Sequence, residues 1–282
     1  MRISEMVSLN SELEHLEESM AALQKKRVVD KAENKLTKLF SGFFKRQGKL
    51  FLEQFEIYKD RFAQTLFPVT ESVSADEIRL ILQQLNPTML ESIKTELIGD
   101  ISEVSIKAMA QTMSNLGITS VDVSFALKNP RAVEFLDKHA AELVTGIDET
   151  TRSNIATIVT NGTKEGLSYD KVAKQITEKY VQFAIGKPQL HIDSRAHLVA
   201  VTESAMAYES GSREIAGYIQ TQGLEMEKSW LTVGDDKVSD GCEENQSEDW
   251  IPIDSSHLSG DDTPPRFPGC RCSELYRHKP SE

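Results

Sequence analysis

The segment that most constrains this chain is residues 228–272, because it interrupts a sequence that otherwise follows helical periodicity. It holds all three cysteines, both tryptophans and a dense run of acidic residues. Lys228–Val233 alternates in the way a strand does, and Trp250–Ile253 is a second extended piece in which Pro252 favours an edge strand. We expect a loop over residues 234–249 between them.

The cysteines of this segment are expected to meet. Cys270 and Cys272 flank Arg271, and residues two apart in an extended chain point the same way, so both sulfurs can lie on one face. Cys242 would approach from the other side of the loop. Together with Trp230 and Trp250, the cysteines predict a compact knob that docks on another protein.

Three cysteines are consistent with a thiolate metal site, with a disulfide plus a spare thiol, or with buried thiols. Structural zinc takes four ligands, so the fourth would be His257, His278 or a carboxylate. No C-x-x-C pair is present, since Ser239 stands three positions before Cys242. We therefore predict no cofactor, with zinc at Cys242, Cys270, Cys272 and His257 as the alternative.

The order of these features resembles the C-terminal domain of the Mu F-like minor head proteins of tailed phages. The matching positions are Lys228, Trp230, Thr232, Asp235, Val238, Cys242, Trp250–Asp254, Pro264, Pro265, Pro268 and Cys270–Cys272. The chain departs from the pattern at Ser239, where a cysteine is expected, and at Phe267, where a histidine is expected. Both departures remove potential metal ligands. A looser similarity reaches upstream, so that the resemblance covers about the last 130 residues.

The resemblance implies a head morphogenesis protein without enzymatic activity. It implies association with the portal vertex, support of head assembly or DNA packaging, assembly in the host cytoplasm and a final place in the virion head. The portal protein is the expected partner, and scaffold or capsid protein are alternatives. Trp230, Trp250, Asp235 and Arg271 are the expected structural and docking residues.

Charge is distributed unevenly along the chain. The net charge of −12 argues against a general nucleic-acid binder, but residues 25–49 hold nine basic and two acidic residues. An acidic partner or packaged DNA could contact this stretch, and the candidate contacts are Lys25, Lys26, Arg27, Lys45 and Arg46. No apolar run approaches the roughly 20 residues of a membrane helix, so no membrane partner is expected.

The remainder of the chain predicts helices, and hence a mainly α fold with a small α+β C-terminal domain. Residues 1–70 are expected to form a helical arm, 71–147 a helical middle region, and 148–282 the Mu F-like domain. The arm begins with a short heptad seam, formed by Met6, Leu9, Leu13, Leu16, Met20 and Leu23. This seam would either pack on its own domain or dock on a partner.

Aromatic residues at helical spacing follow the seam, from Phe40 to Phe62. They predict a helix hairpin with an aromatic core, in which Gly42 or Gly48 marks a kink or turn. An aromatic face that docks on a partner is the alternative.

Beyond the arm, helices are expected at 74–85, 89–116, 130–145, 148–161, 168–180 and 194–222, and residues 121–126 as a linker or short strand. Gly117 and Gly223 fit the ends of two of these helices, and Asp193 or Ser194 fits the cap of the last. That last helix is rich in small residues, which permits close packing.

An enzyme reading is the alternative from another class. Arg195 and Glu203 lie eight residues apart, so on a helix both could sit near one face. A toxin-like transferase of the ADP-ribosyltransferase type would use this pair as its charged site. A zinc-dependent adaptor is the third hypothesis.

Overall fold

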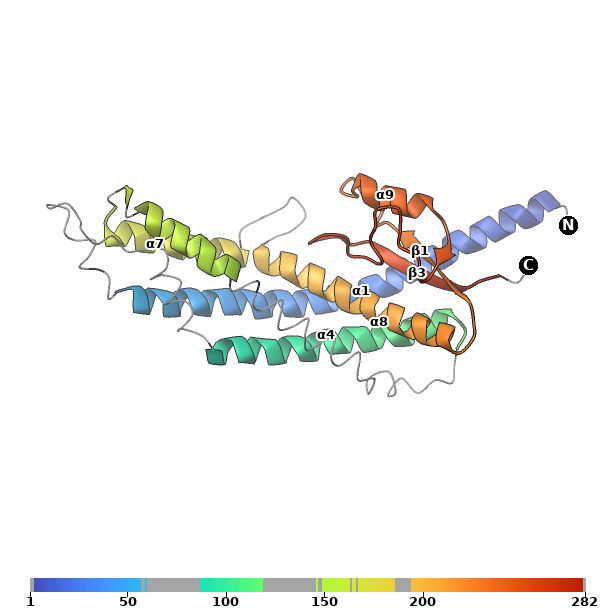
Figure 1. Cartoon of the computed structure of the whole chain (residues 1–282), viewed down its shortest axis with the longest axis horizontal. Helices are drawn as coiled ribbons and strands as arrows, with labels where there is room; N and C mark the ends of the chain where they lie inside the picture. Colours follow the sequence, from blue (N-terminus) through green and yellow to red (C-terminus); the bar gives the residue numbers. More distant parts are fainter. Residues whose placement is uncertain are drawn as a thin grey trace. The chain divides into compact units, whose positions relative to one another are not determined.

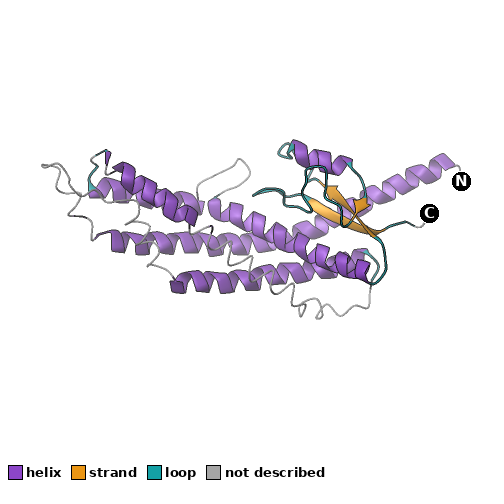
Figure 2. Ribbon diagram, viewed as in Figure 1, coloured by secondary structure: helices purple, strands orange, loops and turns teal. Residues whose placement is uncertain are grey.

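The computed structural model describes residues 3–56, 59, 87–118, 146, 149–162, 164–165, 167–185 and 194–280. The expected features at 74–85, 121–126 and 130–145 lie outside these residues. Long helices fill most of the described chain, and strands occur only near its C-terminus, which confirms a mainly α fold with a small α+β part (Figures 1 and 2). Within this described part, no helix is long and apolar enough to cross a membrane.

The chain divides into two compact units, each made of segments that are separated in the sequence. One unit comprises residues 1–35, 100–134 and 199–282, and the other comprises residues 36–99 and 135–198. The helices α1 (Ile3–Phe55), α4 (Pro87–Asn115) and α8 (Arg195–Thr221) each contribute to both. The expected boundaries at 70 and 147 lie outside the described residues.

Helix α1 is one continuous helix, so the kink or turn expected at Gly42 or Gly48 is wrong. The end of the expected hairpin, beyond residue 59, lies outside the described residues. The absence of a side chain at Gly48 has a packing reason instead. A Cβ atom there would lie 2.7 Å from the ring of Tyr180, on α7 (Tyr169–Ile185). Glycine thus lets an aromatic ring approach the helix backbone closely.

The aromatic residues of α1 do face inward, as their spacing predicts. The buried members are Phe40, Phe43, Phe44, Phe51 and Phe55. Their rings pack on one another and on α7, with Phe44 and Phe183 5.4 Å apart between ring centroids and Phe51 and Phe55 5.5 Å apart. These rings are therefore core residues and are not available to stack on nucleic-acid bases.

Two helix ends form where the sequence predicts them. Helix α4 ends before Gly117, which adopts a φ of +71°, and the Ile118 N–H donates to the Met113 carbonyl at 2.9 Å. Helix α8 begins after Ser194, whose Oγ accepts a hydrogen bond from the His197 N–H at 3.0 Å. Gly223, with a φ of +95°, follows its end.

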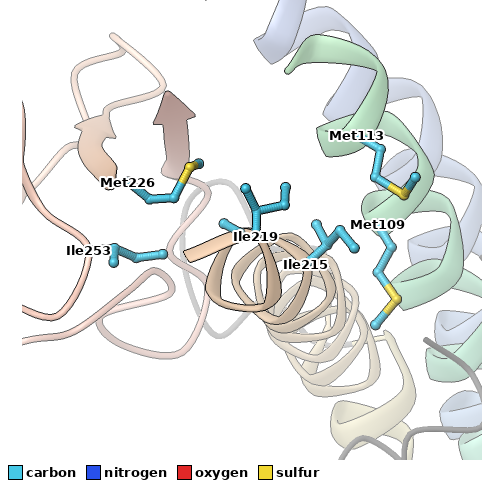
Figure 3. Packing of buried hydrophobic residues seen from close by; sticks show 7 residues of the cluster. Met109, Met113, Ile215, Ile219, Met226 and Ile253 are labelled. Carbon is cyan, nitrogen blue, oxygen red and sulfur yellow. The ribbon is translucent and has the colours of Figure 1, made fainter. Parts of the chain in front are cut away.

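Small residues let α8 pack closely on α4. A Cβ atom at Gly211 would lie 2.4 Å from the Ser105 carbonyl oxygen, and the Ser105 Oγ donates to the Ala207 carbonyl at 2.8 Å. Figure 3 shows the apolar cluster beside this contact, which consists of Met109, Met113, Ile215, Ala216, Ile219, Met226 and Ile253. Met226 and Ile253 come from the C-terminal part, so the cluster joins the two helices to that part.

The C-terminal part contains an antiparallel sheet in the order β2-β1-β3. The central strand β1 (Met226–Leu231) confirms the strand predicted at 228–233, shifted by two residues. Strand β2 (Ile251–Pro252) places Pro252 at the sheet edge, as expected. Strand β3 (Ser273–His278) was not predicted. It pairs along the whole length of β1, so it contributes most of the sheet.

Candidate functional site

The cysteine knob, defined here as Trp230, Cys242, Cys270 and Cys272, forms one buried cluster. Trp230 is 1% exposed on the central strand, and the three cysteines pack against it. Their sulfur atoms all lie within 4.8 Å of one another. The sequence-based prediction that Cys242 meets the Cys270/Cys272 pair beside an indole is confirmed.

Cys242 is positioned by a short helix where a loop was expected. Residues 240–247 form α9 (Asp240–Ser247), and Ser239 caps it by accepting a hydrogen bond from the Cys242 N–H at 3.4 Å. A serine cap followed by acidic residues in the first turn was the available signal, since both suit a helix N-terminus. Ser239, which departs from the Mu F-like pattern, therefore has a structural role here.

Cys270 and Cys272 are positioned by the turn that leads into β3. Gly269 adopts a φ of +86°, and its N–H donates to the Thr202 Oγ1 of α8 at 3.0 Å. The Cys270 N–H donates to the Phe267 carbonyl at 3.0 Å. The pair is thus anchored to both the turn and α8.

The three thiols differ in acidity because they hydrogen-bond to one another. A hydrogen bond from the Cys272 thiol, assisted by backbone N–H groups of Cys272 and Arg266, lowers the pKa of Cys270 to about 5 against the effect of burial. The same contact with Cys270 raises the pKa of Cys272. Burial raises the pKa of Cys242. One thiolate stabilised by neighbouring donors is an arrangement suited to binding a soft metal ion.

His257 does not join the cysteines, although the sequence suggested it as a fourth ligand. Its Nδ1 lies 3.2 Å from Glu248 Oε2, and its Nε2 lies 2.9 Å from Glu274 Oε1. The ring packs edge-on against Trp230, with 5.1 Å between ring centroids. Both ring nitrogens therefore lie within hydrogen-bond distance of carboxylates, and the imidazole ring packs on the Trp230 indole.

The remaining expected docking residues lie within the same C-terminal part. Asp235 and Arg271 form a salt bridge with each other. Trp250 is half-buried, and the Arg277 guanidinium lies 4.2 Å from its ring centroid. Of the two tryptophans, only Trp230 belongs to the buried cluster.

Lys228 shows how a charged residue is accommodated in the central strand. It is 1% exposed, and its Nζ donates to the Asp262 carbonyl at 2.5 Å. Burial lowers the pKa of this amine. Lys228 thus fixes the loop that carries Asp262, which explains why a lysine stands in a buried strand.

Lys25 is not a surface cation, so its expected contact with a partner or DNA is wrong. It is 6% exposed, and its Nζ lies 2.6 Å from Glu209 Oε1 and 2.5 Å from the Cys272 carbonyl oxygen. Glu209 Oε2 in turn accepts from the Glu274 N–H at 3.1 Å. Sequence reasoning missed this pair because its members are 184 residues apart. The other candidates, Lys26, Arg27, Lys45 and Arg46, are exposed.

Arg195 and Glu203, the residues of the transferase hypothesis, belong to different compact units. The Arg195 guanidinium carbon lies 4.7 Å from the ring centroid of Phe183 and 5.1 Å from that of Phe44. The guanidinium also donates a hydrogen bond to Thr151 Oγ1 at 3.2 Å. Burial lowers the pKa of Arg195 to about 10. Glu203 is 3% exposed. The surroundings of Arg195 are those of a packed structural side chain.

The C-terminal part of the chain is similar to a known protein family. Residues 153–275 match the family described as "Phage Mu protein F like protein". No curated protein and no solved structure matches the chain. The matched span includes α7, α8, β1, β2, the first half of β3 and the cysteine knob. The C-terminal part of the chain, residues 153–275, is therefore similar to the phage Mu F-like family.

Proposed function

We propose that this protein is a non-enzymatic minor head protein that associates with the portal vertex of a tailed phage. There it supports head assembly or DNA packaging and remains in the virion head. The family domain supports a role in the head. The observation that carries the portal contact is an exposed apolar face near the N-terminus of α1.

This apolar seam consists of Leu13, Leu16, Met20 and Leu23. Each side chain is between 56% and 60% exposed, although each is of a type that is usually buried. The steps of three, four and three residues place all four on one helix face. Met6 and Leu9, which continue the spacing, have side chains outside the described part. The seam is therefore an exposed apolar surface of the kind that a helical partner covers.

The part of α1 that carries exposed apolar side chains ends at Leu23. Lys25 and Val29 are buried, and from Leu36 onward the helix supplies core aromatics. Deleting residues 1–70, the whole expected arm, would remove this core as well as the seam. A sharper test leaves the helix intact and changes only the seam.

The test replaces Leu13, Leu16, Met20 and Leu23 together by glutamine, which keeps a good helix former at each position. A matched control replaces Ser19, Ala22 and Lys26, which are exposed on the adjoining face, by glutamine. Each variant is expressed with the phage's own portal protein, and co-purification and the dissociation constant are measured.

We expect the seam variant to bind the portal at least about 100-fold more weakly and the control to bind normally. Burying one such side chain contributes about 1.5–3 kcal/mol, so half of that at four positions amounts to about 3–6 kcal/mol, and a 100-fold change needs about 2.7 kcal/mol. Light scattering of each chain alone detects self-association. The proposal fails if the seam variant binds the portal normally, or if the seam holds two copies of this chain, a scaffold protein or a capsid protein instead.

A further inference from the structure

The cysteine knob contains every cysteine of the chain, and the proposed portal contact uses none of them. The three residues come from α9 and from the turn before β3, about 28 residues away along the chain. All three are buried, at 1% to 3% exposure, and all three are free thiols. A packing role requires burial, but it does not require three sulfurs to converge on one point.

The spacing of the sulfurs fits a shared ion better than a pairwise bond. A disulfide would join two sulfurs and exclude the third, whereas here each sulfur lies within 4.8 Å of both others. Tetrahedral zinc with bonds of about 2.3 Å holds its sulfur ligands about 3.8 Å apart. A contraction of at most about 1 Å would bring the three sulfurs to that separation.

We propose that Cys242, Cys270 and Cys272 bind one zinc ion, with the fourth position taken by water or another exchangeable ligand. Thiolates favour zinc or copper(I) over magnesium and calcium, which prefer oxygen ligands. No histidine or carboxylate joins the three sulfurs among the residues that the structure describes. His257 is held by Glu248 and Glu274, so it does not supply the fourth ligand.

The surroundings of the sulfurs suit charged thiolates. The Trp230 indole nitrogen is buried without a partner in ordinary hydrogen-bond geometry, and Trp230 packs directly on the cysteines. An N–H group beside a thiolate is typical of the residues that surround metal ligands. The cap on Ser239 and the contact between Gly269 and Thr202 hold both cysteine-bearing segments in place. The site is therefore largely formed before an ion arrives.

The experiment uses the full chain, purified under reducing conditions and stripped of metal with a chelator. Zinc is titrated against a chromophoric chelator, and bound metal is measured by elemental analysis. Cobalt(II) then replaces zinc, because its thiolate charge-transfer absorption grows with the number of sulfur ligands. A Trp250→Phe background leaves Trp230 as the single indole, whose fluorescence bound cobalt should quench.

We expect about one zinc per chain and a cobalt spectrum with three thiolates. Each of Cys242→Ser, Cys270→Ser and Cys272→Ser should weaken binding at least about 10-fold. The controls Asp240→Asn and Glu243→Gln change exposed acids of α9 beside Cys242 and should bind normally. If a serine variant does not fold, the cobalt spectrum and the quenching of Trp230 in the otherwise unchanged chain still decide.

Three results would overturn the proposal. The first is less than about 0.2 zinc per chain at excess zinc, which excludes a stoichiometric site. The second is one free thiol per chain in a separate preparation purified without reductant, which indicates a disulfide. The third is loss of binding in the acidic controls but not in the cysteine variants. None of these results bears on the apolar seam, so the two proposals are tested separately.

Discussion

The ion pair between Lys25 and Glu209 is the contact whose removal should cost the most stability. It links α1, α8 and β3, since Lys25 also bonds the Cys272 carbonyl and Glu209 also accepts from the Glu274 N–H. The two side chains are 7% and 1% exposed. Removing one partner of a buried pair leaves the other charge uncompensated, which typically costs about 3–5 kcal/mol. We expect Lys25→Met to lower the free energy of unfolding by about 3 kcal/mol at pH 8.

The loss should depend on pH because Glu209 titrates near neutrality. Burial raises the pKa of Glu209 to about 7, and Lys25 opposes that rise. A carboxyl whose folded pKa lies above its unfolded value destabilises the fold as pH rises from the unfolded pKa to the folded one. Methionine at position 25 removes the opposing cation, so the pKa of Glu209 rises further. The variant should therefore lose more stability at pH 8 than at pH 5, where Glu209 is already neutral in both proteins.

The measurement is urea unfolding followed by tryptophan fluorescence at both pH values, with Lys26→Met as the control. Lys26 is the exposed neighbour, so its replacement should change the free energy of unfolding by less than about 0.5 kcal/mol. Replacing Lys25 and Glu209 together by methionine should restore part of the loss, because no buried charge is then left alone. Equal stability of Lys25→Met and the unchanged protein at pH 8, or a larger loss at pH 5, would refute this reasoning.

The remaining predictions concern helix packing and DNA. Gly211→Ala should lower the free energy of unfolding in urea by about 2 kcal/mol, because its Cβ would lie 2.4 Å from the Ser105 carbonyl oxygen. Gly217→Ala is the control on the same helix. Its Cβ would have no neighbour within 4 Å, so this variant should raise the free energy of unfolding by up to about 1 kcal/mol. A loss at Gly217 as large as that at Gly211 would contradict the packing argument. Lys45 and Arg46 are exposed, and a contact of each with packaged DNA would contribute about 1 to the slope of log affinity against log salt concentration. Replacing both by glutamate should remove that contribution. Lys164→Glu, the control at another exposed lysine, should leave the slope unchanged. An unchanged slope in a gel-shift titration would exclude the contact.

The features that the sequence predicted correctly are those that depend on residues close to one another in the chain. Gly117 and Gly223 stand where helices end, because a residue after a helix often adopts a positive φ. The alternation at 228–233 and the proline at 252 located two strands, since both depend on neighbouring residues only. Cys270 and Cys272 could be placed on one face for the same reason.

Signals that depend on distant partners failed. Gly48 was read as a turn because nothing nearby in the sequence reveals that Tyr180 packs on it. Strand β3 was missed because its residues alternate weakly, and its pairing with β1 is what makes it a strand. Helix α9 was read as a loop because its Gly241 and Asn245 are poor helix formers, although Asn245 is buried and bonds Ser259 instead.

Lys25 and the apolar seam show why periodicity alone does not predict which side chains of a helix are covered. Polar and apolar periodicity describes a helix face, but it does not say what covers that face. Leu23 and Lys25 are two residues apart, yet the leucine is 57% exposed and the lysine 6% exposed, the reverse of what their types favour. The lysine is buried because Glu209 and the Cys272 carbonyl satisfy it, and the leucine is exposed because no described segment covers it. An inversion of this kind stabilises the fold at one position and leaves apolar surface for a partner at the other, which is why the seam is where we expect the portal to bind.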